Sequence, residues 1–256
     1  MIHPTAIVHP GATVDADVDI GPYAVIGEHV KIGRGTRIGP SAVIDGWTEI
    51  GENNQIFHLS SVGAIPQDLK YRGEETYLKI GNGNIIREFA TIHLGTVTGD
   101  NETTIGDNNL FMAYCHVAHD CHIGNRVVMA NGATLAGHIT VEDYAILGGL
   151  CAVHQFVRIG ENVMIAGGAM VGQNVPPYTM ASGDRATLHG LNLVGLKRRG
   201  FSDEIISDLK KAYRILIRSG LRTDEALVRI RKEIRQSPEV AHFVDFVENS
   251  ERGICR

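Results

Sequence analysis

An aliphatic residue recurs at every sixth position over most of this chain, and this period limits the possible folds more than any other feature. From Ile2 to Val62, all eleven positions at this spacing are isoleucine or valine. The spacing resumes from Ile80 to Ile92, slips by one residue, and continues from Ile105 to Val171. Neither an α-helix nor a two-layer sheet requires an apolar residue every six positions over such a length.

The six-residue period predicts a parallel β-solenoid. Each hexapeptide of such a fold forms one short strand and one turn, and three hexapeptides complete one coil of a triangular prism. The repeated aliphatic side chain points into the prism, and a following glycine, as in Ile26-Gly27, lets the chain turn tightly. The matching positions predict about nine stacked coils.

Two segments interrupt the period, and we expect both to leave the prism as loops. Residues 66–76 place Asp68 and Glu74 where apolar residues belong, and residues 95–104 contain the one-residue slip. Loops on a rigid scaffold often carry functional residues. The solenoid is expected to span residues 1–185, with Pro176-Pro177 closing it.

Residues 186–256 change to a helical period and predict a separate C-terminal helical domain. Ser202 and Thr223 are expected N-caps of two helices, because each precedes apolar residues spaced three and four apart. Ser237-Pro238 combines an N-cap with proline at the first helical position and predicts a third helix.

Charge is distributed unevenly between the two parts. Residues 1–185 contain 19 acidic and 10 basic side chains, whereas residues 186–256 contain 10 acidic and 14 basic ones. An acidic main domain argues against nucleic-acid binding, while the basic end suits an acidic partner or a phosphorylated ligand. We expect a cytoplasmic protein without membrane insertion, because the chain has no apolar run of membrane-spanning length, no signal-peptide pattern and no CxxC pair.

Twelve histidines are present, and those between Cys115 and His122 could suggest a metal site. His116 and His122 are six residues apart, so the prism places them on adjacent faces, where one ion cannot easily reach both. We therefore expect no metal site.

A different set of histidines is expected to converge. Residues 18 apart stack on successive coils, and Val117, Leu135 and Val153 form such a column. The turns that follow them carry His119, His138 and His154. These three histidines and Asp120 should therefore share one face, with an imidazole as general base and Asp120 as the group that orients it.

The chain resembles the trimeric hexapeptide-repeat acyltransferases with a C-terminal helical domain. Within these enzymes it is most similar to the family that transfers an acyl chain from acyl carrier protein to UDP-N-acetylglucosamine at the start of lipid A synthesis. The matching segments follow one another along nearly the whole chain: Gln67–Tyr71, Thr91–His93, Ala118–Cys121, Leu135–His138, Ala152–Phe156 and Gly195–Ser202. The resemblance implies a left-handed parallel β-helix and a homotrimer.

The resemblance also implies a mechanism. His119 would accept the proton of the sugar 3-hydroxyl as that oxygen attacks the acyl thioester, and Asp120 would hold the ring. The backbone N–H of Gly137 would stabilise the oxyanion. No acyl-enzyme is needed, and no cofactor is expected beyond the phosphopantetheine of the acyl carrier protein.

Further residues are assigned to substrate binding by resemblance alone. The first loop would contact the sugar and the acyl chain, and histidines would line a cleft between subunits; the residues concerned are Gln67, Asp68, Lys70, His93, His116, His138, His154 and Gln155. Asn192, Arg198 and Arg199 match positions that bind the nucleotide, although a solvated basic turn would explain the two arginines equally simply. Val194 departs from the family pattern, which has glutamate near the uridine.

Acyl-chain length in this family depends on the residue at the end of the chain groove. The matching position is Gly167, and a glycine leaves the groove long. The resemblance therefore implies a long 3-hydroxyacyl chain of about fourteen carbons. Whether the acceptor atom is a 3-hydroxyl or a 3-amino group stays open.

Three alternatives were weighed against this interpretation. The later N-acyltransferase of the same pathway has an additional N-terminal domain, for which the repeats starting at Ile2 leave no space. A zinc hydratase on this solenoid would use an H-x4-H pair, which the chain lacks. A non-catalytic solenoid would lack the His119 base and the loop residues, and both are present.

Overall fold

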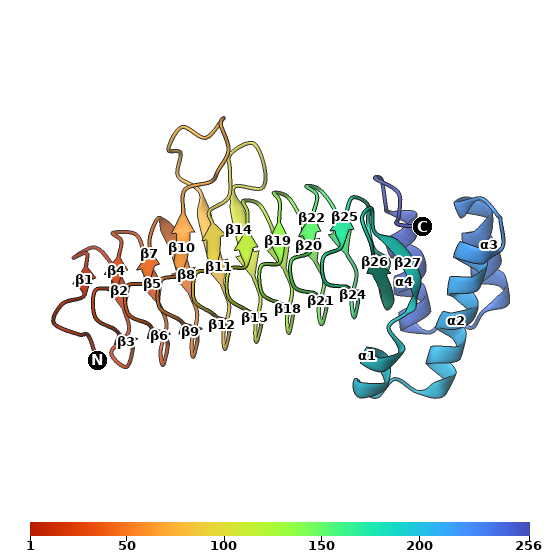
Figure 1. Cartoon of the computed structure of the whole chain (residues 1–256), viewed down its shortest axis with the longest axis horizontal. Coiled ribbons are helices and arrows are strands. Elements are labelled where there is room, and N and C mark those ends of the chain that lie inside the picture. Colours follow the sequence, from red (N-terminus) through yellow and green to blue (C-terminus); the bar gives the residue numbers. More distant parts are fainter.

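The hexapeptide repeats form a parallel β-helix, as the period predicts. The computed structural model describes all 256 residues, and Figure 1 shows a long rod of stacked coils with helices gathered at its C-terminal end. Three sheets form the sides of the rod, and within each sheet neighbouring strands come from successive coils.

The strands of each sheet follow in spatial order. Sheet I contains β1 (Ile7–Val8), β4 (Val25–Ile26), β7 (Val43–Ile44), β10 (Ser61–Ala64), β13 (Thr91–His93), β16 (His116–Val117), β19 (Thr134–Leu135), β22 (Ala152–Val153) and β25 (Met170–Val171). Sheet II contains β2 (Thr13–Val14), β5 (Lys31–Ile32), β8 (Trp47–Ile50), β11 (Tyr77–Ile80), β14 (Glu102–Ile105), β17 (His122–Ile123), β20 (Thr140–Val141) and β23 (Arg158–Ile159). Sheet III contains β3 (Asp19–Ile20), β6 (Arg37–Ile38), β9 (Gln55–Ile56), β12 (Ile85–Ile86), β15 (Leu110–Phe111), β18 (Val128–Met129), β21 (Ile146–Leu147), β24 (Met164–Ile165), β26 (Thr179–Ser182) and β27 (Thr187–Leu191).

Residues 18 apart lie side by side on successive coils. Val117 pairs with Leu135, and Leu135 pairs with Val153. In most strands the repeated aliphatic residue is buried while the residue before it is more exposed, which explains the strict period. The inward column forms a single core cluster of 44 buried residues along the rod.

Two loops leave the rod where the period breaks. One joins β10 to β11 and the other joins β13 to β14, and Figure 1 shows them side by side on one flank of the rod. The second loop is shorter than its expected range of 95–104, because residues 102–104 belong to β14. This strand is four residues long since it pairs with all four residues of β11, from Tyr77 to Ile80.

The rod does not end at Pro176-Pro177. The strand β26 follows these prolines and pairs in parallel with β24, so sheet III continues beyond them. The next strand, β27, turns back and pairs with β26 in antiparallel orientation. This hairpin connects the rod to the helices.

Four helices complete the chain: α1 (Leu193–Arg198), α2 (Asp203–Arg218), α3 (Thr223–Glu233) and α4 (Pro238–Glu248). Ser202 and Ser237 cap α2 and α4 as expected. Thr223 was expected to be an N-cap, but it is the first residue of α3 and Arg222 precedes it. Glu225 accepts the backbone N–H of Arg222 at 3.2 Å, and this bond moves the start of the helix by one residue.

The helical domain has its own core of 17 buried residues and is attached to the end of the rod. Nε2 of His242 on α4 lies 2.7 Å from Oε2 of Glu142, and Arg158 lies 3.5 Å from the same carboxylate. The Arg158 guanidinium also stacks on the Phe246 ring. None of the four helices has the length and apolar character that crossing a membrane requires.

Candidate active site

The corner between sheets I and II gathers the side chains around His119. Each turn from a sheet I strand to the next sheet II strand places two columns at this corner, with residues 18 apart stacked on successive coils. The first column is His119, Gly137 and Gln155, and the second is Asp120, His138 and Phe156. Asp120 has a left-handed backbone with φ of 57°, which turns the chain sharply there.

His119 and Asp120 form a hydrogen-bonded pair. Nδ1 of His119 donates to Oδ2 of Asp120 at 2.7 Å, and Asp120 is completely buried. The same carboxylate accepts hydrogen bonds from the backbone N–H and the hydroxyl of Thr96 at 3.0 and 2.6 Å, and from the backbone N–H of Asp100 at 3.1 Å. The loop between β13 and β14 therefore supplies three of the hydrogen bonds to the carboxylate, and His119 supplies the fourth.

These contacts keep the Asp120 carboxylate ionised. Burial alone would raise its pKa, but the hydrogen bonds from His119 and Thr96 outweigh burial and lower the pKa below its ordinary value. An ionised Asp120 fixes the imidazole hydrogen on Nδ1 of His119. Nε2 of His119 has no hydrogen-bond partner within the chain, so its lone pair is available as a base.

Gly137 lies directly against the His119 ring. A Cβ added to Gly137 would be 2.6 Å from Cε1 and 2.8 Å from Nε2 of His119. The backbone N–H of Gly137 donates no hydrogen bond within the chain. A glycine at this position therefore leaves both space and a free donor beside the proposed base.

A cavity of about 920 Å³ opens in front of this corner. The loop between β10 and β11 contributes Gln67, Asp68 and Lys70 to its wall, and Gln155 contributes from the rod. His119 and His138 also line it. The structure thus brings together the predicted base, its carboxylate and five of the twelve predicted binding residues.

The other histidines near the site differ in their partners. His138 stacks on Phe156 at 4.4 Å between ring centroids and meets His119 edge-on at 5.0 Å. His116 contacts Thr91 through Nδ1 at 2.7 Å and the ring of His93 at 4.9 Å. Burial lowers the pKa of all three histidines at positions 93, 116 and 138, and that of His93 to about 4. They are therefore neutral at pH 7.

His93, His116 and His154 do not line this cavity. His154 is exposed, and its ring contacts only the carbonyl of Gln155. It occupies the column of Ala118 and Ala136, one residue earlier in the turn than His119, so its side chain leaves the rod in another direction. The expected convergence holds for His119, His138 and Asp120 only.

The positions expected at the nucleotide lie on or beside α1. Asn192 is the buried N-cap of this helix: its side chain accepts from the N–H of Gly195 and donates to the carbonyl of Asn162. Arg198 is exposed without a hydrogen-bond partner, and the Arg199 guanidinium stacks on the Tyr144 ring. Val194 is also exposed. Asn192 has a structural role, and Lys197 and Arg198 are the exposed, unpaired cations of α1.

Gly167 lies outside the cavity, in the exposed turn after β24. The nearest atom to a Cβ added there would be the carbonyl oxygen of Gly149, at 3.2 Å. A larger side chain would therefore extend from the surface of the rod, more than two coils beyond His119.

Sequence reasoning missed three residues around the site. Thr96 and Asp100 lie on the second loop, which was expected to be functional, but no repeat or motif indicated that their N–H groups meet Asp120. The six-residue spacing excludes His122 as a metal ligand beside His116 and predicts no other role for it. It pairs with Asp100, with Nε2 of His122 2.7 Å from Oδ2.

His119, Asp120 and His138 offer ligand atoms within 4.8 Å of one another, and this trio is the one grouping that could hold a metal ion. The two oxygens of Asp120 already accept four hydrogen bonds, from His119, Thr96 and Asp100. A carboxylate has about four acceptor positions. The donor set therefore suits a hydrogen-bonded base better than a metal centre.

The cysteines lie inside the rod and take no part in the site. All four are free and buried, and burial raises the pKa of Cys115 to about 11. A protonated, enclosed thiol is a poor nucleophile.

Comparison with known proteins gives consistent matches over the whole chain. Residues 174–255 match the family described as UDP-N-acetylglucosamine O-acyltransferase, domain 2, and residues 102–137 match the bacterial transferase hexapeptide repeats. The acyl-[acyl-carrier-protein]–UDP-N-acetylglucosamine O-acyltransferase of Thermodesulfovibrio yellowstonii is 59% identical, with 100% of this chain and 99% of that protein covered. The protein of the same name from Thiobacillus denitrificans is 53% identical with the same coverage.

Solved structures agree with these matches. LpxA from Acinetobacter baumannii is 45% identical with a TM-score of 0.97, and the match covers 100% of this chain and 99% of that one. The UDP-N-acetylglucosamine acyltransferase of Francisella novicida is 42% identical with the same TM-score, covering 100% and 94%. The Arabidopsis UDP-N-acetylglucosamine acyltransferase is 40% identical with a TM-score of 0.87, covering 100% of both chains.

Proposed function

The chain belongs to the acyl-[acyl-carrier-protein]–UDP-N-acetylglucosamine O-acyltransferase family and is an acyltransferase, and from this premise we propose that His119 is its general base. The reaction transfers a (R)-3-hydroxyacyl chain from acyl carrier protein to the 3-hydroxyl of UDP-N-acetylglucosamine, the first step of lipid A biosynthesis. The free Nε2 of His119, held opposite an ionised Asp120, is the observation that carries the proposed mechanism.

The proton follows a closed path. As the 3-hydroxyl oxygen bonds to the thioester carbonyl carbon, its proton moves to Nε2 of His119. The imidazolium is stabilised by Asp120, to which its Nδ1–H already donates. When the carbon–sulfur bond breaks, His119 returns the proton to the phosphopantetheine sulfur. The attacking oxygen belongs to the substrate, so no acyl-enzyme forms.

Gly137 is proposed to stabilise the oxyanion. The carbonyl oxygen gains negative charge during attack, and the unpartnered N–H of Gly137 lies beside the His119 ring. A preorganised backbone donor near the base is the arrangement that acyl transfer requires.

Substrate recognition is assigned to the cavity and to α1. Gln67, Asp68 and Lys70 face the cavity with Gln155, and we infer that they contact the sugar and the start of the acyl chain. Arg198 is exposed and unpaired, which suits a diphosphate. Arg199 would have to leave Tyr144 to do the same. The exposed Val194 adds no polar group to this region, so Arg198 carries more of the nucleotide contact.

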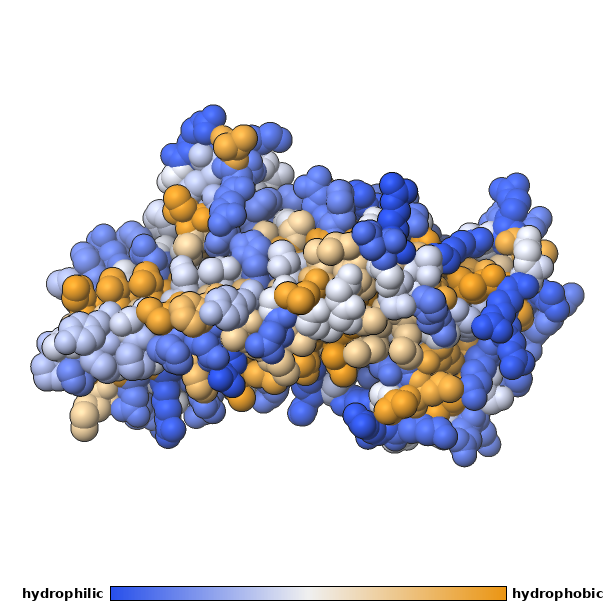
Figure 2. All heavy atoms as spheres, in the orientation of Figure 1, coloured by the Kyte–Doolittle hydropathy of each residue, from blue (hydrophilic) through white to orange (hydrophobic).

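A homotrimer with the site between neighbouring subunits is part of this proposal. Exposed apolar side chains stand two residues before strands of sheet I, along the corner between sheets III and I: Leu59, Phe89, Tyr114 and Leu150. Figure 2 shows apolar patches along the rod between the N-terminal coils and the helices. Such a row is unusual for an isolated chain and suits contact with a second copy. His93, His116 and His154, which lie outside the cavity of one chain, would then face a neighbouring subunit's site.

The acyl groove is proposed to be long because Gly167 places no side chain on the rod. No cofactor takes part beyond the carrier's phosphopantetheine. We infer a cytoplasmic location, since all four cysteines are unpaired.

A transfer assay tests the proposal. Purified protein is incubated with UDP-N-acetylglucosamine and 3-hydroxyacyl carrier proteins of several lengths, with and without a chelator, beside His119→Ala. We expect chelator-resistant product, and a loss of kcat of about 10³-fold in the variant. Product that disappears with chelator would contradict the metal-free mechanism, and activity that survives His119→Ala would contradict the assignment of the base. If no chain length gives product, the 3-hydroxyl acceptor is wrong and the 3-amino sugar is tested next.

The oligomeric state is measured separately by light scattering after size exclusion. A particle of three 27.8 kDa chains is expected. A 27.8 kDa particle would contradict the homotrimer.

A further inference from the structure

A side-chain hydrogen bond fastens the loop between β13 and β14 to the side of the rod. Nε2 of His122 on β17 lies 2.7 Å from Oδ2 of Asp100 in the loop, and Nδ1 of His122 lies 2.8 Å from Oγ1 of Thr104. The neutral ring satisfies both partners when its hydrogen is on Nε2 and Nδ1 accepts from the Thr104 hydroxyl. His122 thus connects the loop to the strand that ends it.

The fastened loop is also the part of the chain that holds Asp120. Asp100 uses its side chain for His122 and its backbone N–H for Oδ1 of Asp120. Thr96, at the start of the loop, supplies two further donors to the same carboxylate. Gly99 packs so closely on Asp120 that an added Cβ would collide with the carboxylate. Any shift of the loop at Asp100 is therefore transmitted to Asp120.

We propose that His122 is a positioning residue for the catalytic pair. By fixing Asp100, it keeps the loop N–H groups on Asp120, and Asp120 in turn keeps Nε2 of His119 directed into the cavity. This inference rests on the proposed function of His119. It assigns a catalytic consequence to a half-buried residue that lines the same cavity as His119 and forms no hydrogen bond with it.

The exposure of the pair suits this indirect role. The Asp100 side chain is 69% exposed and that of His122 is 33% exposed, so the pair contributes little to global stability. Its effect should instead appear in the geometry of the loop, whose other bonds to the rest of the chain include those to Asp120 and two with Tyr77: Gly95 N–H donates to the Tyr77 carbonyl, and Tyr77 N–H donates to the Asn101 carbonyl.

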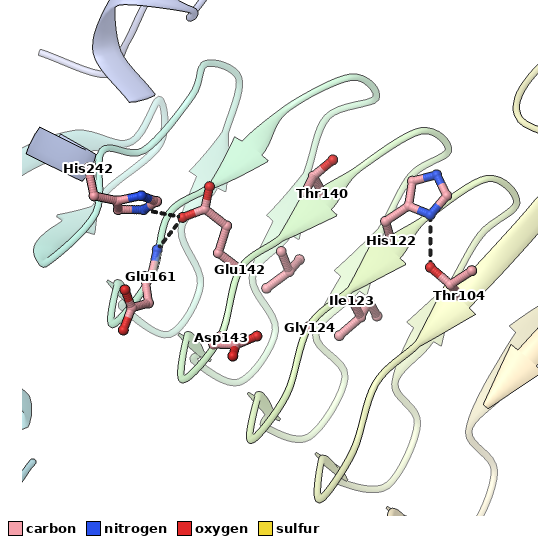
Figure 3. A pocket seen from close by; sticks show the side chains of 10 residues that line it. Thr104, His122, Ile123, Gly124, Thr140, Glu142, Asp143, Glu161 and His242 are labelled. Carbon is pink, nitrogen blue, oxygen red and sulfur yellow. Dashed lines mark hydrogen bonds and ion pairs between the residues drawn. The ribbon is translucent and has the colours of Figure 1, made fainter. Parts of the chain in front are cut away.

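A second histidine in the same groove provides a matched control. Figure 3 shows His122 bonded to Thr104 at one end of a groove on sheet II and His242 bonded to Glu142 at the other end. The His242 pair has the same 2.7 Å separation, and its histidine is similarly exposed at 38%, although its partner Glu142 is more buried than Asp100. It holds helix α4 and has no contact with the second loop or with Asp120.

The test compares His122→Phe with His242→Phe in the acyl transfer assay. Phenylalanine keeps a ring of similar size on an exposed strand position and removes both nitrogens. We expect His122→Phe to lower kcat about tenfold with little change in KM. The lost charge-assisted hydrogen bond is the one to Asp100, which acts on His119 only through Asp120. His242→Phe should retain the wild-type kcat. His122→Gln, which keeps an amide donor toward Asp100, should recover part of the loss.

A double-mutant cycle separates positioning from other effects. In an Asp120→Asn background, followed through its residual turnover at raised enzyme concentration, the loop has no carboxylate to hold. His122→Phe should then change kcat by less than about twofold. A tenfold loss in both backgrounds, or a loss expressed in KM, would overturn the proposal, since it would mean that the loop and Asp100 act on the substrate directly. Unchanged kcat in His122→Phe would also overturn it.

Failure of the His122 proposal can be distinguished from failure of the proposed role of His119. If His119→Ala retains activity, the base itself is wrong. If His119→Ala is inactive while His122→Phe equals the wild type, only the positioning role is wrong. The melting temperature of each variant is measured alongside, and a loss of kcat with an unchanged melting temperature supports positioning.

Discussion

The rod and the helical domain are stabilised in different ways. The rod has a continuous core of 44 buried residues, built from the repeated aliphatic side chain of each hexapeptide and from small or aliphatic residues that mostly stand two positions before it. Each coil packs mainly on the coils before and after it. The helical domain has a separate core of 17 buried residues where α2, α3 and α4 pack together. Its connections to the rod include the β26–β27 hairpin, the contacts of α4 with Glu142 and Arg158, and the pairing of the C-terminal residues 253–255 with Asn174.

This difference predicts different roles for the rod and the helical domain. Strand register in the rod places residues 18 apart at a fixed spacing, so His119, Gly137 and Gln155 are aligned without any long side chain having to be held in place. The helical domain has no such register, and its proposed contribution to the site is the exposed basic surface at α1. In the proposed function, the rod positions the reacting groups and the helices attract the charged ligand.

The largest effect is expected from removing one core aromatic in each region. Phe111 in β15 and Phe243 in α4 are both fully buried, and Phe→Ala at either position should cost about 3–5 kcal/mol of unfolding free energy. Phe243→Ala should lose hydrogen-exchange protection only in the helices, whereas Phe111→Ala should lose it in the neighbouring coils. Loss of protection over the whole chain in both variants would show that the two regions unfold as one unit.

Gly137→Ala should affect the rate more than the fold. The new methyl group would push the His119 ring away from its position beside the Gly137 N–H, and kcat should fall about 10²-fold, within the range for a displaced base or oxyanion donor. Gly172→Ala is the matched control, because a Cβ at Gly172 meets no atom within 4 Å. A Gly137→Ala enzyme with wild-type kcat would mean that the rod does not fix the base as tightly as described.

Gly167→Met should change the preferred acyl chain. A side chain at this exposed turn would shorten the groove along the rod, so kcat/KM for the longest 3-hydroxyacyl carrier proteins should fall about tenfold relative to shorter ones. The measurement is a competition assay with mixed chain lengths. An unchanged order of preference would place the chain on another side of the rod.

The smallest effect is expected at the junction between the regions. The hydrogen bond that His242 donates to the Glu142 carboxylate raises the pKa of His242 above 6.5 against the opposing effect of burial, with Glu161 and Arg158 also facing the ring. A raised folded-state pKa means that the stabilisation is fully present below about pH 6.5 and is lost as pH rises through the folded value. Because the pair is partly exposed, it should contribute less than about 1 kcal/mol.

Thermal unfolding of the wild type and of His242→Gln between pH 6 and pH 9 tests this last prediction. The two melting temperatures should differ most at pH 6 and converge toward pH 9. A difference that grows with pH would contradict the sign of the pKa shift.

The fold was predictable because every coil repeats one physical requirement. An inward aliphatic side chain is needed once per hexapeptide, so the period revealed the sheets, the 18-residue stacking and both loops. The ends were harder to predict. Nothing in the sequence around Pro176-Pro177 indicates that β26 extends sheet III. The start of α3 was predicted one residue too late, because the period does not show the bond between Glu225 and the Arg222 backbone.

The site was predictable only to the extent that it follows the register. His119, Asp120 and His138 meet because they stand on successive coils, whereas His154 is one residue out of phase and leaves in another direction. The support of Asp120 by Thr96 and Asp100 comes from a loop that has no repeat. Its folded path depends on side-chain contacts such as His122 with Asp100, which the order of residues alone does not reveal.

The stacking of coils turns the rod into a length standard. Each coil adds about 4.8 Å, so the number of coils between the turn of His119 and the end of sheet III sets how far the basic surface of α1 lies from His119. In the proposed function, a substrate of fixed span, with a diphosphate at one end and an acceptor oxygen at the other, has to match that distance. Inserting one complete 18-residue coil would preserve every local contact in the rod and still place the two ends of the nucleotide sugar out of reach of their partners.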